Sequence, residues 1–220
     1  ADADGSAVHW NISLHNQSDK ERELTVLVLV RPFAINQAIS PICTIATEDA
    51  ERLWINGDLF MFSETSVSQT GVGLLEEAMA AALDGTVPPK TMITSAPAGN
   101  GAAVFAYRLQ LEPDGDEAIL LSFPDELGEG LSNSLSDHDN LIAAAVAEWD
   151  QSIGVVGLDL PDNLVEQGAM ASMGYLLLSL DPDGPHPGPL AHDALWVRDA
   201  AYAGLALLQF GHAGAVRSTI

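Results

Sequence analysis

The chain has 220 residues, 47% of them hydrophobic, and its 31 acidic residues outnumber 8 Lys and Arg to give a formal net charge of −23. This composition is typical of a soluble globular protein, and it argues against nucleic-acid binding and against attachment to an anionic membrane, both of which need concentrated positive charge. It favours a neutral or cationic partner and leaves the cellular compartment open. Cys43 is the single cysteine, so we expect no intrachain disulfide and no cysteine-based metal site. The sequence motifs predict no cofactor.

The first strand-like stretches lie near the start of the chain. The segment "VHWNISLHN" (8–16) alternates apolar and polar residues, and "LTVLVLVRPF" (24–33) follows a polar turn, which together predict a long β-hairpin. A second hairpin is predicted within "AERLWINGDLFMFSE" (50–64), where Asn56-Gly57-Asp58 supplies the turn.

One helix interrupts these strands at "GVGLLEEAMAAALDG" (71–85), where apolar residues recur at helical spacing before a terminal glycine. Strand patterns resume over 91–96, 101–113 and 116–124. At least seven strands with short turns indicate two antiparallel sheets packed as a β-sandwich. Trp10 and Trp54 lie on strands, and we expect core packing for both in preference to a carbohydrate platform.

The composition changes at about residues 124 to 137, a polar, acidic stretch that we interpret as a linker. Beyond it the pattern is wholly helical, with helices predicted from residues 139, 161 and 193; Asp162 marks the start of the second, and Asp193 is the predicted N-cap of the third. We therefore expect an α+β protein with three parts: a β-sandwich domain over 1–124, a linker with a helix over 125–160, and a helical region over 161–220.

The third predicted helix carries two adjacent charges, Arg198 and Asp199, on a surface that is otherwise apolar or small. A helix that is apolar nearly all round belongs in an inner layer, and an unpaired buried charge there costs several kcal/mol, roughly. The two charges therefore need a partner or an open cavity. They are either a structural salt bridge that holds the preceding loop or a polar patch that binds a polar, neutral ligand.

The segment "ALWVRDAAYAGLALLQFG" (194–211), which follows a helix and a "PGP" loop, resembles the W-x-R-D segment of the six-hairpin (α/α)6 glycosidases. This superfamily includes glucoamylases, glucodextranases and debranching-type enzymes. The resemblance implies that residues 161–220 begin an (α/α)6 toroid behind a β-sandwich and a linker helix. It also implies that Arg198 and Asp199 hydrogen-bond sugar hydroxyls where the non-reducing end of the substrate sits, with Trp196 as a nearby wall.

The two catalytic carboxylates of that family lie further along its barrel, so the resemblance assigns no catalytic residue to this chain. The expected function is that of the N-terminal portion of a glycoside hydrolase acting on glucan-like oligosaccharides, inactive as this fragment. The exposed face of its last two helices is expected to be apolar, which predicts self-association.

Two alternatives stay open: a sugar phosphorylase, and a free-standing, non-catalytic β-sandwich module that binds carbohydrate or protein. The loop "DPDGPHPG" (181–188) is interpreted as a connector between helices, because it lacks the spacing of a calcium loop. The identity of the sugar, its linkage and the oligomeric state stay open as well.

Overall fold

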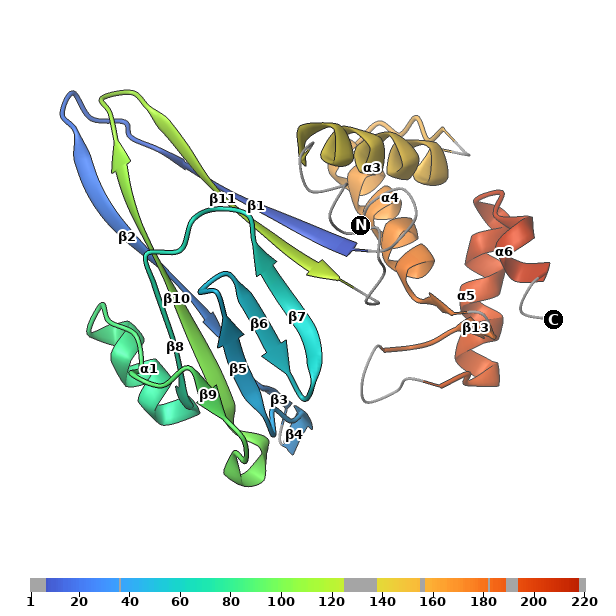
Figure 1. Ribbon diagram of the computed structural model, residues 1–220. Helices are drawn as coiled ribbons and strands as arrows, with labels where there is room; N and C mark the ends of the chain where they lie inside the picture. Colours follow the sequence, from blue (N-terminus) through green and yellow to red (C-terminus); the bar gives the residue numbers. More distant parts are fainter. Residues whose placement is uncertain are drawn as a thin grey trace. The chain divides into compact units, whose positions relative to one another are not determined.

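A computed structural model describes residues 7–35, 37–124, 138–154, 157–181, 183–188 and 194–217 (Figure 1). The chain is an α+β protein with mostly antiparallel sheets. Its contacts divide it into two compact units, Ala1–Ile142 and Ala143–Ile220, which we call the sheet unit and the helical unit. The acidic first part of the predicted linker, residues 125–137, lies outside the described residues. No helix among those described is both long and apolar enough to cross a membrane.

The larger sheet of the sheet unit has six antiparallel strands. Their order is β1 (Ala7–His15), β11 (Asp116–Pro124), β7 (Asp58–Ser63), β6 (Arg52–Ile55), β5 (Ile45–Glu48) and β9 (Met92–Ile93). The predicted second hairpin is confirmed, because β6 pairs with β7 across a turn in which Asn56 and Gly57 have φ angles of 54° and 100°. Positive φ at both central positions suits an Asn-Gly pair, since glycine and asparagine tolerate this backbone better than other residues.

The smaller sheet has three strands, in the order β2 (Arg22–Val30), β10 (Gly101–Leu111) and β8 (Gln69–Leu74). The predicted first hairpin is wrong, because β1 pairs with β11 in the larger sheet while β2 pairs with β10 in the smaller one. The polar turn between β1 and β2 therefore carries the chain from one sheet to the other. Alternation alone defines a strand but does not identify its partner, so the sequence pattern fits both connections.

Shorter elements complete the sheet unit. The predicted helix is confirmed as α1 (Leu75–Leu83), which packs against β8 and β10. Strands β3 (Phe33–Ile35) and β4 (Gln37–Ser40) form a small separate ladder, and η1 (Pro97–Gly99) is a single helical turn before β10.

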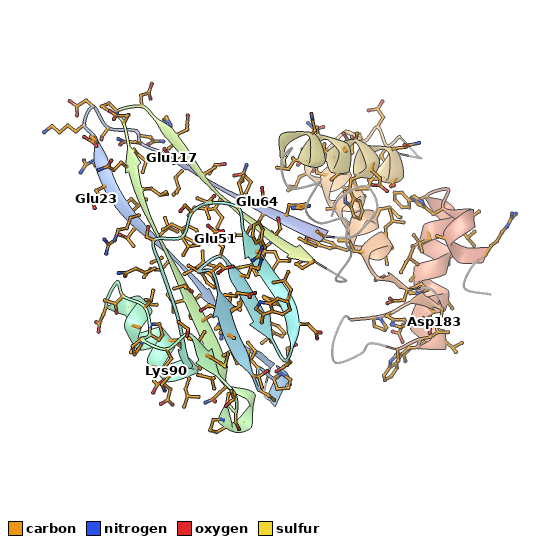
Figure 2. The ribbon with its side chains drawn as sticks, in the orientation of Figure 1. Glu23, Glu51, Glu64, Lys90, Glu117 and Asp183 are labelled. Atoms are coloured by element: carbon orange, nitrogen blue, oxygen red, sulfur yellow. The ribbon has the colours of Figure 1, made fainter. Side chains whose placement is uncertain are left out.

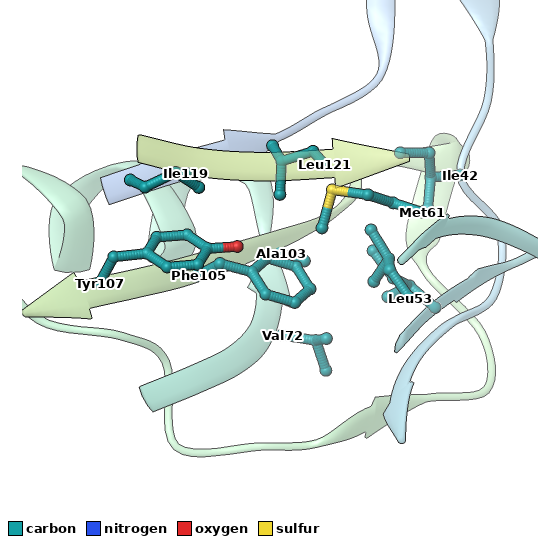
Figure 3. Close-up of a cluster of buried hydrophobic side chains, with 10 residues drawn as sticks. Ile42, Leu53, Met61, Val72, Ala103, Phe105, Tyr107, Ile119 and Leu121 are labelled. Atoms are coloured by element: carbon teal, nitrogen blue, oxygen red, sulfur yellow. The ribbon is translucent and has the colours of Figure 1, made fainter. Parts of the chain in front are cut away.

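Both sheets contribute to one hydrophobic core, in which β10 is the central strand. Its side chains alternate, so that Phe105 and Tyr107 join the main cluster while Val104 packs with α1 on the other face. Figure 3 shows side chains from β7, β10 and β11, including Met61 and Leu121, pointing into this cluster. Coverage on both faces explains why residues 101–107 are all buried.

The expectation that Trp10 and Trp54 pack in the core is wrong for both. Trp10 is 54% exposed and contacts the ring of Phe123, with the ring centroids 4.9 Å apart. Trp54 is partly exposed on β6 and lies outside the core cluster. The residues that follow Trp10 and flank Trp54 on their strands, including Ile12, Leu53 and Ile55, supply the packing there instead.

The core contains one buried polar pair. The Tyr107 hydroxyl donates to Ser63 Oγ at 2.9 Å, and Ser63 Oγ donates in turn to the carbonyl of Thr65 at 2.7 Å. Burial raises the pKa of Tyr107 above its ordinary value of 10.0, the charge of Glu51 adds to this effect, and the hydrogen bond with Ser63 opposes it.

We expect a Tyr107→Phe variant to be less stable at neutral pH by about 1 kcal/mol, because Ser63 loses a donor in a buried place. Since the folded-state pKa of Tyr107 is raised, its contribution is complete below pH 10.0 and is lost as pH rises through the folded value. Denaturant unfolding between neutral and strongly alkaline pH should therefore show a steeper decline for the wild type than for the variant. Parallel curves for the two proteins would contradict this assignment.

The helical unit contains most of α3 (His138–Ile153), followed by α4 (Asn163–Leu178), α5 (Val197–Gln209) and α6 (Ala213–Arg217). Strands β12 (Leu180–Asp181) and β13 (Gly184–Pro185) form a short hairpin after α4. The predicted start of α4 is confirmed, because Asp162 Oδ1 accepts a hydrogen bond from the Leu164 amide at 2.8 Å.

Helix α5 begins four residues later than predicted, and Trp196 occupies its N-cap position. The predicted cap, Asp193, lies outside the described residues. The expectation of an inner-layer helix is wrong for the described structure, because α5 contacts α4, β13 and α6 and leaves Val197, Tyr202 and Leu205 exposed. The predicted exposed apolar face is confirmed on both helices, and Leu164 and Leu178 are exposed on α4.

Candidate functional site

Helices α4 and α5 and the β12–β13 hairpin line an open pocket of about 580 Å³, which we call the helical pocket. Each element supplies one side of it, because α5 contacts both α4 and β13. The side chains and backbone that line it come from Ser172, Tyr175, Leu176, Ser179, Pro185, His186, Pro187, Asp199, Tyr202, Ala203 and Ala206.

Two tyrosines give the helical pocket its largest side chains. Tyr175 on α4 is 73% exposed and Tyr202 on α5 is 72% exposed, so both rings and both hydroxyls are accessible to a ligand. Two serines on the α4 side are already engaged as donors: Ser172 Oγ donates to the Gly168 carbonyl at 2.7 Å, and Ser179 Oγ donates to the Leu176 carbonyl at 2.8 Å. Their oxygen lone pairs remain as acceptors, while each tyrosine hydroxyl can donate and accept.

Asp199 brings a carboxylate to this pocket from the first turn of α5. A negative charge is favoured there, because the unpaired amides at a helix N-terminus give it partial positive charge. Its side chain is 40% exposed. The helix fixes the backbone of Asp199, and its carboxylate stays accessible to solvent. Both properties suit a group that accepts hydrogen bonds from a ligand.

Arg198 and Trp196 lie at the N-terminal end of α5. Arg198 Nη2 lies 3.7 Å from Asp199 Oδ2, and the arginine side chain is 80% exposed. Trp196 is half-exposed at the N-cap. The structure thus brings Arg198 and Asp199 together, whereas only Asp199 of the three predicted residues lines the helical pocket. An exposed pair of this kind contributes little to stability.

His186 lies at the edge of the pocket, in the loop that the sequence pattern predicts to be a connector. His186 Nδ1 lies 3.2 Å from Asp181 Oδ2, and His186 Nε2 lies 2.9 Å from Asp183 Oδ1, with the histidine side chain 12% exposed. Figure 2 labels Asp183 on this hairpin. The D-P-D-G-P-H spacing, which keeps His186 close in sequence to Asp181 and Asp183, is the sequence signal for this contact.

Electrostatics restrict what the pocket accepts. The net charge of −23 disfavours anionic ligands, and a tyrosine- and serine-lined pocket has no concentrated positive charge to offset it. Among the described residues, no group of three or more His, Cys, Asp and Glu side chains has a geometry that could hold a metal ion. The arrangement is therefore suited to reversible binding of a neutral, hydroxyl-rich molecule. No family model matches the chain, and no curated protein matches it.

Proposed function

We propose that this chain is the N-terminal portion of a glycoside hydrolase of the six-hairpin type, and that its helical pocket holds a sugar unit of a glucan-like oligosaccharide. The observation that carries the proposal is the meeting of Asp199 with two exposed tyrosines in one pocket, on the segment that resembles the W-x-R-D motif. In this proposal the two sheets are a β-sandwich, α3 is the linker helix, and α4 and α5 form the first hairpin of an (α/α)6 toroid.

Sugar hydroxyls both donate and accept, and the two charges on α5 offer both functions at one place. The guanidinium of Arg198 donates, the carboxylate of Asp199 accepts, and their 3.7 Å separation lets adjacent sugar hydroxyls reach both groups. Charge-assisted hydrogen bonds are stronger than neutral ones, and this compensates for the desolvation of the sugar. Tyr175 and Tyr202 supply apolar ring faces together with hydroxyls that can serve as further partners.

The proposed role of this chain is binding and orientation. A glycosidase needs a carboxylic acid to protonate the leaving oxygen and a second carboxylate to activate water or attack the sugar. The resemblance assigns those two groups to later helices of the family's barrel. Asp199 and Arg198 would then fix the non-reducing end so that the scissile bond meets the catalytic pair.

The test is an Asp199→Asn and an Arg198→Ala variant in the complete native gene product, assayed for glucose release from maltohexaose. We expect kcat/KM to fall by about tenfold to a hundredfold in each, since hydrogen bonds to charged groups are worth about 1.5–3 kcal/mol. Asp150→Asn is the matched control, because Asp150 is an exposed acid on α3 that does not line the pocket. Thermal unfolding should be nearly unchanged in all three variants.

Unchanged turnover in the Asp199 variant would remove this carboxylate from the substrate site. Release of a sugar phosphate that depends on added phosphate would favour the phosphorylase alternative. A native product that binds oligosaccharides without cleaving any of a panel of linkages would favour the non-catalytic module.

A further inference from the structure

A second groove lies on the sheet unit, on the face of the six-stranded sheet that points away from the core. Ile45, Leu53 and Ile93 belong to or pack against the core cluster, so the residues next to them on β5, β6 and β9 face outward. The strand register places Ala46 directly beside Trp54 on one side and Met92 on the other. A small residue between two large ones leaves a hollow, and the structure has a pocket of about 220 Å³ there. We call it the Trp54 groove.

The wall of this groove is held in place. Trp54 Nε1 donates to Glu48 Oε2 at 3.1 Å, so the polar edge of the indole is satisfied by the protein. Glu48 lies two residues from Ala46 on the same face of β5. A fixed indole whose N–H is already bonded offers a ligand an apolar face, and orienting it costs little further entropy.

One end of the groove is also fixed before any ligand arrives. Asn56 Oδ1 accepts hydrogen bonds from the amides of Cys43 at 2.8 Å and Thr44 at 3.1 Å, while Asn56 Nδ2 donates to the Pro41 carbonyl at 2.9 Å. This clasp sets the position of Thr44, which lines the groove. Gly57 lines it next to the clasp, and a side chain there would meet nothing within 4 Å, so this end is open.

The polar groups of the groove are uncharged hydroxyls. Thr44 and Thr94 both line it, and within the described part of the chain neither side chain is engaged in a hydrogen bond. Met92 is 59% exposed on the side opposite the indole. An apolar aromatic wall combined with free hydroxyls matches a neutral ring that has an apolar face and an edge of hydroxyl groups. The net charge of −23 disfavours phosphorylated and other anionic ligands.

We propose that the Trp54 groove binds one pyranose ring of an oligosaccharide, with the ring stacked on the Trp54 indole and its hydroxyls bonded to Thr44 and Thr94. The groove holds one ring and carries no carboxylate pair, so its role is to retain a chain and not to cleave it. The inference goes beyond the proposed function: it uses residues of the sheet unit alone, and it holds or fails whether or not the helical pocket binds sugar.

The test uses the 220-residue chain with maltohexaose and cellohexaose as probes, followed by saturation-transfer NMR and tryptophan fluorescence. Trp54→Ala is expected to weaken the binding of at least one probe by about tenfold, since aromatic stacking is the main contact. Ala46→Leu keeps the indole but fills the hollow, so it should weaken binding as strongly. Circular dichroism and thermal unfolding of both variants establish that the sheet unit is folded.

Two controls separate this site from others. Trp10→Ala removes another exposed tryptophan of the same sheet and should leave affinity unchanged. Asp199→Asn alters only the helical pocket, so sugar binding that survives it and disappears with Trp54→Ala supports the groove independently of the proposed function. The inference is overturned if neither probe binds the wild type at millimolar concentration, or if folded Trp54→Ala and Ala46→Leu variants bind as the wild type does.

Discussion

A Gly71→Ala variant is expected to lose about 3 kcal/mol or more of stability, or to fail to fold, because β8 has no room for a side chain at this position. A Cβ atom on Gly71 would overlap the carbonyl oxygen of Pro88 and lie 2.8 Å from its carbonyl carbon. The opposing segment cannot move aside easily, since the amide of Val72 donates to the Lys90 carbonyl at 2.7 Å. Relief of the overlap would therefore break this bond or displace β8 from β10.

The matched control is Gly168→Ala, a glycine-to-alanine change in α4 where an added Cβ meets nothing within 4 Å. It should raise stability by about 0.5–1 kcal/mol, because alanine loses less backbone entropy in a helix. Urea unfolding of both variants, followed by tryptophan fluorescence and far-UV circular dichroism, measures the difference. A Gly71→Ala protein with wild-type stability would mean that the 88–90 segment does not lie against β8.

The second large effect is expected at Asn16, which is 7% exposed at the start of the turn between β1 and β2. Its Nδ2 group lies 2.8, 3.0 and 2.9 Å from the carbonyl oxygens of Lys20, Leu111 and Glu112, which share its two N–H donors. Its Oδ1 accepts from the amide and hydroxyl of Ser18. One side chain thus joins the turn after β1 to the turn after β10. Asn16→Ala should cost about 3 kcal/mol, because one buried and two partly buried carbonyls lose their donor together.

Asn16→Asp distinguishes hydrogen bonding from shape, because it keeps the size of the side chain and the acceptor for Ser18. At neutral pH it places a negative oxygen against three carbonyl oxygens, so it should be at least as destabilising as Asn16→Ala. Protonation of the new carboxyl group restores a donor, so the deficit should shrink as pH falls toward about 4. A deficit independent of pH in urea unfolding would show that the amide group is not the link between the two turns.

The elements that could be predicted from the sequence are those specified by residues within the element itself. The turn at Asn56 and Gly57 needs positive φ at two consecutive positions, and few residue pairs tolerate this. Helix α1 is predicted by apolar residues at helical spacing and by the glycine that follows them. The partners of β1 and β2 were not predictable in this way, because they lie far along the chain, in β11 and β10, and alternation within a strand does not identify the strand that pairs with it. The role of Gly71 depends on Pro88 for a similar reason: the two meet only in the folded sheet unit.

In the candidate site, too, the residues with a local sequence signal were predictable and those brought in by packing were not. Arg198 and Asp199 stood out because charge is rare on their segment, and the structure places their side chains together at the surface. Tyr175 gave no comparable signal, and the spacing around His186 says nothing of Asp199, since the meeting of these residues in one pocket depends on how α4, β13 and α5 pack. Trp54 was assigned to the core because large apolar residues are usually buried. Its outward direction follows from the register of β5 and β6, which no single strand reveals.

The pairing of β1 with β11 and of β2 with β10 has a consequence for how the protein forms. Strands β1 and β11 lie side by side (Figure 1), and His9 and Ser122 form a hydrogen bond across this pair although 113 positions separate them. Strands β1 and β2 must therefore wait for β11 and β10, which are synthesised later, before they find partners. Chains dominated by such distant contacts fold slowly and expose unpaired strand edges in the meantime. The long apolar strand β2 is then the segment most open to wrong association during synthesis, and the high negative charge of the whole chain provides a general protection against it.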